Sequence, residues 1–397
     1  MKKTGPKVVV GMFVFLLCML LLPCRAAFAS SGVSAGPPQP TQSAQAGQDA
    51  RQGVSQQLNG IDFSGIDKLI KDSGAPVNSL RELVDSAIAG KLDLSPGSLL
   101  AQAARLIFNE LYAQADLIRS LLIVALLSAL FKVMGEAFKN KGVGELGFYA
   151  SYVVLIIILF QSFKIALDIT QGLVGVVAAL MEACAPLVVT LLIMTGSVAS
   201  SYVFNPLILF ASGILTEFVS RLILPVISLA AMIHIVNYLT ESAMLQKLSE
   251  LLKDGCSFIV KALCLLFVAA LSLQKISMPI LDNVTFKTAK SAVGAIPVVG
   301  GPINSAADVV LLWAGAAKSG VLIALIILAV VIFTVPVIKV FALFLVYKVT
   351  AAVIQPVADK RIVECVDGMG DFALVFTGVC VLTSLMFIVM AVIVLAF

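Results

Sequence analysis

The sequence predicts an all-α polytopic membrane protein with about eight transmembrane helices, inverted internal repeats and proline-broken segments. Of its 397 residues, 60% are hydrophobic and only 13% are charged, whereas about a quarter of the residues in soluble domains are charged. The apolar residues form runs close to the roughly 20 residues that a helix needs to cross a bilayer. A secretory signal precedes these runs.

Residues 1–29 have the three parts of a signal peptide. Three lysines precede the short apolar run 8–22, and Ala27-Phe28-Ala29 supplies a small-x-small cleavage pattern. We expect cleavage before Ser30; the alternative is an uncleaved anchor. In both cases the segment that follows begins outside the cytoplasm.

The net charge of +4 comes from the signal peptide, since without it 23 basic residues balance the 23 acidic ones. No cluster of Lys and Arg with interleaved aromatics remains, so nucleic-acid binding is not expected. The cysteines left after the signal peptide form no CxxC pair and no metal-ligand spacing with histidine. We therefore predict no metal and no cofactor.

Two extracytoplasmic regions are expected between the signal peptide and the membrane domain. Residues 30–60 are rich in Ser, Gly, Gln and Pro and are typical of a flexible linker. Residues 61–116 are amphipathic, with apolar side chains at helical spacing from Leu80 to Ile88. This region is either a small docking domain or a helix lying on the bilayer surface.

The polytopic domain is predicted over 117–397. Its spans are expected at about 117–134, 147–164, 203–221, 224–240, 257–274, 320–335, 337–354 and 372–396. The run 174–196 resembles a ninth span, but Glu182 and Pro186 interrupt it.

Prolines recur at a fixed offset in this domain. Pro186 and Pro297 are 111 residues apart, and so are Pro225 and Pro336. We infer repeat units at about 114–224 and 225–335, with a partial third at 336–397. If the Pro186 and Pro297 segments do not cross, each unit has three spans and successive units are inverted.

The distribution of positive charge agrees with an external N-terminus. The predicted cytoplasmic loops 135–146, 275–319 and 355–371 contain Lys and Arg, whereas the external loop 165–202 contains neither. The loop 241–256 contains Lys247 and Lys253 and fits less well.

Ionisable or helix-breaking residues within the spans are the candidates for function. They are Glu182, Pro186, Glu217, Arg221, His234, Pro297 and Pro336. Each also has a structural explanation: Glu217 and Arg221 can pair at i,i+4, and His234 can be a packing histidine. No nucleophile with its base is visible, so no catalytic residue is predicted.

Two stretches resemble the stage III sporulation protein AE family of endospore-forming Firmicutes. They are Thr288-Ala289-Lys290 followed by Ile296-Pro297-Val298-Val299-Gly300 and Ala306-Ala307-Asp308, and Pro336-Val337-Ile338-Lys339 followed by Gln355-Pro356. The resemblance covers about 110–397. Asn205-Pro206 stands where the family pattern would have His-Pro.

The resemblance implies a multi-pass protein of the mother-cell membrane around the forespore. It implies membership of a channel complex that connects the two cells and is needed for late forespore development. The implied partners are an ATPase and ring-forming proteins of the same operon and a forespore channel partner. The alternative that the residues leave open is a stand-alone secondary transporter; an intramembrane enzyme is not expected.

Overall fold

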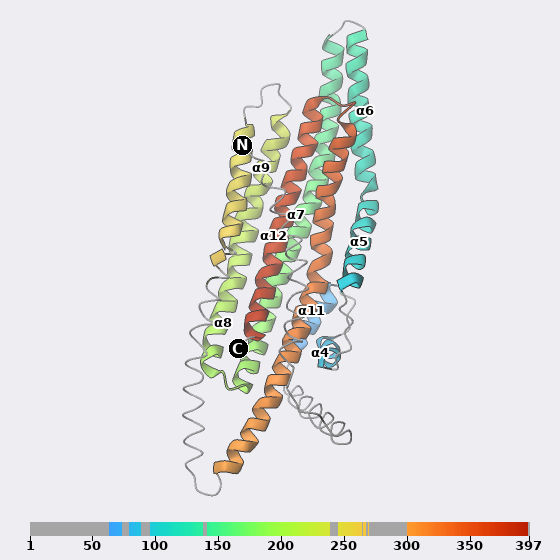
Figure 1. Cartoon of the computed structure of the whole chain (residues 1–397). Coiled ribbons are helices and arrows are strands. Elements are labelled where there is room, and N and C mark those ends of the chain that lie inside the picture. The colour runs from blue at the N-terminus through green and yellow to red at the C-terminus, as the bar shows by residue number, and fades with distance from the viewer. Residues whose placement is uncertain are drawn as a thin grey trace.

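The computed structural model is an elongated bundle of long helices (Figure 1). The residues that it describes are 63–73, 79–88, 96–137, 141–238, 245–263, 265–266, 269 and 300–395, and these contain helices and short turns without a strand. The predicted signal peptide, the 30–60 linker and Pro297 lie outside these residues.

Five described helical stretches are long and apolar enough to cross a membrane. They are Ala115–Gly135, Glu145–Met194, Ile208–Asn237, Ala314–Ile354 and Lys360–Val392. The predicted all-helical membrane class is therefore confirmed.

The eight separate spans are not confirmed, because three pairs of predicted segments each form one helical stretch. The runs 147–164 and 174–196 merge in α7 (Lys141–Met194), and 320–335 and 337–354 merge in α11 (Gly300–Ile354). The run 203–221 and the described part of the run 224–240 form a helical stretch of α8 (Val198–Gly213), the π-helix η1 (Ile214–Ile223) and α9 (Leu224–Asn237). Continuous helix keeps each backbone group paired within its own segment, as an apolar medium requires.

The proline breaks expected at Pro186 and Pro336 are wrong, since α7 and α11 run through them. Each proline lacks the N–H that would bond the carbonyl four residues earlier, that of Glu182 or Ile332. The nearby threonine hydroxyls bond other carbonyls: Thr190 donates to Pro186 at 2.8 Å, and Thr334 donates to Val330 at 2.6 Å. The inverted repeat is not confirmed, because most of the stretch that would match the second half of α7 lies outside the described residues.

Two predicted loops are mostly helical as well. Residues 165–194 of the expected external loop belong to α7, and α12 (Lys360–Leu395) takes up most of the expected cytoplasmic loop 355–371. Lys318, expected in a loop, is buried in α11. Local polarity indicates loops here, but Lys318 is buried, and Asp367 and Asp371 of the expected loop 355–371 pair with Lys348.

The centre of the bundle is α12, which forms a hairpin with α11 and also packs on α7 (Figure 1). The most apolar 18-residue stretch of α12 is 78% buried. The corresponding stretch of α6 (Ala115–Ala137) is only 22% buried, so α6 faces outward. Buried hydroxyls tie the central helices together. Tyr152 donates to the Ile235 carbonyl at 2.7 Å, and the Ser162 and Tyr347 hydroxyls are 2.6 Å apart. Such interhelical bonds hold apolar helices in register.

Three helices from the 61–116 region pack on the bundle. The helix α3 (Ser64–Ser73) contacts α7, whereas α4 (Leu80–Ile88) and α5 (Pro96–Ala113) both contact α11, and α5 leads into α6. The buried side chains are Phe63, Ile66, Ile70, Leu80 and Val84. The Leu80 amide donates to Asp67 at 2.8 Å, which joins α4 to α3.

Asp359 caps the N-terminus of α12 at the α11–α12 turn. Its carboxylate accepts the Arg361 amide at 3.0 Å and lies 3.4 Å from Lys132 of α6. Burial raises the pKa of Asp359, but Arg361 and Lys132 outweigh burial and hold the pKa below its ordinary value.

We expect Asp359→Ala to destabilise the protein by about 1 kcal/mol, because the cap is lost, and Asp359→Asn to retain most of that stability. Because the folded-state pKa is lowered, the part of this contribution that depends on charge is present above the unfolded pKa near 4 and is lost as pH falls through the folded value. Thermal unfolding in detergent at pH 7 and at pH 3 measures the difference. Equal destabilisation by Asp359→Ala at both pH values would contradict the ionised cap.

Candidate functional site

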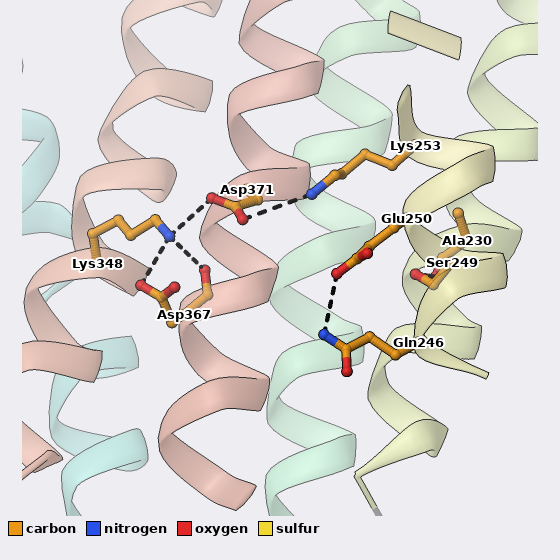
Figure 2. Close-up of polar contacts among 8 residues, drawn as sticks. All are labelled: Ala230, Gln246, Ser249, Glu250, Lys253, Lys348, Asp367 and Asp371. Carbon is orange, nitrogen blue, oxygen red and sulfur yellow. Dashed lines mark hydrogen bonds and ion pairs between the residues drawn. The ribbon is translucent and has the colours of Figure 1, made fainter. Parts of the chain in front are cut away.

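Four charged side chains meet between α11, α12 and the helix over 246–263 (Figure 2). Lys348 of α11 uses its three ammonium donors on α12: Asp367 Oδ1 at 2.8 Å, the Asp367 carbonyl at 3.0 Å and Asp371 Oδ1 at 2.9 Å. A lysine with all three donors on one helix fixes the register of α11 against α12. We call Lys253, Lys348, Asp367 and Asp371 the charge network.

Asp371 is shared between two lysines. Its second carboxylate oxygen lies 3.7 Å from Lys253, whose ammonium also lies 5.7 Å from the centre of the Phe372 ring. The Lys253 contact is longer than the Lys348 contact and is therefore the weaker connection in the network. Two lysines and two aspartates make the network neutral.

The helix that carries Lys253 is attached more closely to α9. The Ser249 hydroxyl donates to the Ala230 carbonyl at 2.8 Å (Figure 2), and the Leu245 amide donates to the Asn237 side chain at 2.8 Å. The ion pair between Lys253 and Asp371 therefore joins α9 and the helix over 246–263 to the α11–α12 hairpin.

Two glycines in α12 make the close packing around the network possible. A Cβ at Gly368 would overlap the His234 imidazole, and one at Gly370 would lie 3.1 Å from Lys348 Cε. His234 projects from α9 and is 9% exposed, with the rings of Tyr238 and Phe372 edge-on at 5.1 and 5.4 Å. Its Nε2 has no hydrogen-bond partner among the described residues.

The local sequence explains this geometry. Asp367 and Asp371 are one helical turn apart, so their carboxylates lie on one face of α12. The intervening glycines lack the side chains that would keep α9 and α11 away. Both α11 and α12 are candidate membrane spans, where unpaired charge is costly. Pairing lets the network link helices in that environment.

The charge network connects three helices through paired charges. Among the described residues no group of His, Cys, Asp and Glu could hold a metal ion. The four described cysteines are buried and free.

The six predicted candidates that the structure describes lie on α7, η1, α9 and α11. Glu182 and Pro186 are exposed on α7, and Pro336 lies within α11. Glu217 and Arg221 form the predicted i,i+4 ion pair at 3.1 Å, with 62% and 70% of their side chains exposed. Of the six candidates that the structure describes, His234 is the one that borders the charge network.

The sequence alone does not predict the network. Its polarity places Asp367 and Asp371 in the predicted loop 355–371, and its hydropathy places Lys348 in the predicted span 337–354. One signal was available: Asp367-Gly368-Met369-Gly370-Asp371 places two acids one turn apart with glycines between them. That pattern is typical of tightly packed helices with charged partners.

These features define a helical membrane protein with an ion-pair network between its spans. The family model of stage III sporulation protein AE matches residues 78–397, and the chain belongs to that family. Stage III sporulation protein AE of Bacillus subtilis (strain 168) is 27% identical over 301 residues, which are 76% of this chain and 75% of the relative. No solved structure matches the chain. The predicted family is therefore confirmed.

Proposed function

We propose that this chain is a non-enzymatic, multi-pass membrane subunit of the channel complex that connects the mother cell to the forespore. The observation that carries the proposal is family membership over 78–397, which includes all five candidate membrane spans found among the described residues. The location in this proposal is the mother-cell membrane around the forespore, with the N-terminus outside the cytoplasm.

The partners in this proposal are those that the family resemblance implies. They are an ATPase and ring-forming proteins of the same operon and a channel partner from the forespore. Five long apolar helices support a role as a membrane-embedded platform for such proteins. The neutral charge network supports a scaffold role, since it connects helices through paired charges.

A clean, in-frame deletion of the gene tests the proposal. We expect development to stop after the forespore has been engulfed, with loss of late forespore gene expression and recovery when the wild-type gene is restored. Heat-resistant spores at normal numbers from the deletion strain would overturn the proposal. Uptake or efflux of solute by the purified chain alone in liposomes would instead favour a secondary transporter.

A further inference from the structure

The candidate spans of α7 and α11 are too long to lie wholly inside one bilayer. They contain 50 and 41 residues, and because a helix rises about 1.5 Å per residue, they are about 75 and 62 Å long. The hydrocarbon core is about 30 Å thick, and transmembrane helices are tilted by at most about 40°. At that tilt the α7 span would still cover about 57 Å. Part of each helix therefore lies beyond the core.

The exposed surface of α7 changes near residue 165. Up to that point its exposed large apolar side chains are Leu146, Tyr149, Val153, Val154, Ile157, Phe160 and Ile165. From 166 to 192 α7 exposes no large apolar side chain. The exposed positions there are Asp168, Gln171, Gly172, Gly175, Glu182, Pro186 and Thr190. Large apolar side chains suit lipid tails, so the first part of α7 is the part suited to contact with lipid.

Exposed charged residues occur where this change takes place. They lie on three helices: Lys164 and Asp168 on α7, Glu217 and Arg221 on η1, and Lys339 on α11. We call these five residues the charged belt. Exposed charge is costly in hydrocarbon and is tolerated where side chains reach the membrane surface. The belt therefore indicates an edge of the hydrocarbon core.

The groove between α7 and η1 shows that two parts of the belt are neighbours. Leu167 of α7 and Ser220 of η1 both line this groove. These two residues directly precede Asp168 and Arg221 in the sequence. The belt residues of α7 and η1 therefore lie at one level along the bundle.

The third part of the belt, on α11, lies at the same level. The helix α11 runs antiparallel to α7, because α12 forms a hairpin with α11 and lies parallel to α7. The hydroxyls of Ser162 on α7 and Tyr347 on α11 are 2.6 Å apart. Asp168 and Lys339 each follow about two turns further in the same direction along the bundle.

Two charged helices pack on the far side of the belt. A Cβ at Gly65 of α3 would lie 3.8 Å from that of Ala183, and Ala183 is about 22 Å beyond Asp168 along α7. The helix α4 contacts α11 and lies in the lower half of Figure 1. Both helices bury apolar side chains in the bundle and expose charged ones, such as Lys68 and Asp85. Their charged outer surfaces require water, so this end of the bundle lies outside the hydrocarbon.

We infer that the bilayer surrounds the bundle on one side of the charged belt and that the end bearing α3 and α4 projects from the membrane into water. The lipid contact on α7 extends from Leu146 to Ile165, about 30 Å, which matches the hydrocarbon core. The projecting end includes α8, the C-terminal half of α7 and the part of α11 before Lys339. The inference goes beyond the proposed function and uses none of its partners.

Maleimide labelling of single added cysteines tests this placement. The full chain is produced in growing cells, protoplasts are treated with a maleimide, and the wild-type chain measures labelling of the native cysteines. Maleimides react with the thiolate, which forms in water and not in an apolar medium. We expect Thr190→Cys to be labelled several-fold more than Ile157→Cys, the matched control at an exposed position in the lipid-facing part of α7. Similar labelling of the two variants, or stronger labelling of Ile157→Cys, would overturn the inference.

A cysteine on α3 identifies the side of the membrane on which the end projects. We expect Lys68→Cys and Thr190→Cys both to react with a maleimide that cannot cross the membrane. If both react only with a membrane-permeant maleimide, the projection is supported and the external N-terminus of the proposed function is wrong. Reaction of the two cysteines from opposite sides would overturn the projection.

The helix α8 gives the most demanding test, because it exposes Tyr202, Leu209 and Phe210 in the projecting end. Apolar side chains also occur on surfaces that face water. We therefore expect Tyr202→Cys to be labelled as strongly as Thr190→Cys. Protection of Tyr202→Cys from the maleimide would place α8 in lipid and contradict the projection.

An inserted charge gives an independent readout. Ile157→Lys places an ammonium group far from both ends of the lipid-facing surface, whereas Thr190→Lys adds one to a surface in water. We expect Ile157→Lys to lower the amount of protein in the membrane several-fold and Thr190→Lys to leave it unchanged. Equal membrane levels of the two variants would contradict contact between Ile157 and lipid.

Discussion

Replacing Gly368 by alanine should destabilise the bundle strongly. The added methyl group would overlap the imidazole of His234, which is enclosed by Tyr238 and Phe372. Separation of α9 from α12 or a strained His234 rotamer must follow, and overpacking of this kind costs about 1–3 kcal/mol. Thermal unfolding of the purified protein in detergent measures the loss.

Two further variants identify the cause. Gly378 lies on the same helix, and a Cβ added there would meet no described atom within 4 Å beyond the local helix backbone. Gly378→Ala should therefore be neutral or stabilising by up to about 1 kcal/mol. Combining Gly368→Ala with His234→Ala should recover stability relative to Gly368→Ala alone, because the obstructing ring is gone. Equal stability of Gly368→Ala and Gly378→Ala would show that His234 does not contact Gly368.

Replacing Lys348 by methionine should have a comparably large effect. The substitution preserves an unbranched side chain but leaves Asp367 and Asp371 one turn apart with Lys253 as the remaining cation. Hydrogen bonds to charged groups contribute about 1.5–3 kcal/mol. Because the two carboxylates are about half exposed, we expect a loss of about 2 kcal/mol, near the lower end of that range. Thermal unfolding of the purified variant measures it.

Neutralising one carboxylate should rescue this loss. The double variant Lys348→Met/Asp367→Asn leaves Asp371 paired with Lys253, so the network is neutral again. Lys360→Met is the control, because Lys360 is 86% exposed and pairs with Glu364 at 3.6 Å on the surface, where such pairs contribute less than about 1 kcal/mol. If Lys348→Met is no more harmful than Lys360→Met, the network does not hold the helices together.

The sequence predicted the helical membrane class because apolar composition and run length follow directly from bilayer thickness. It also predicted the pairing of Glu217 with Arg221, which needs only helical spacing. These features are local. The family could be recognised because the residues around Pro297 and Pro336 are distinctive.

Features that depend on packing could not be predicted in the same way. Proline alone predicts breaks at Pro186 and Pro336, but α7 and α11 run through both positions. Asp367 and Asp371 resembled loop residues because their partner, Lys348, becomes a neighbour only when α11 and α12 form a hairpin. The sequence shows which residues are charged, whereas the packing of the helices determines which opposite charges they meet.

Sporulation of strains whose only copy carries a network variant tests whether the charge network supports the protein's function. Heat-resistant spores are counted for the wild type, Lys348→Met and Lys348→Met/Asp367→Asn, with membrane levels of each protein followed by immunoblot. We predict few spores from Lys348→Met and substantial recovery in the double variant. Wild-type spore numbers from Lys348→Met, with the protein present at normal levels, would contradict a role for the network.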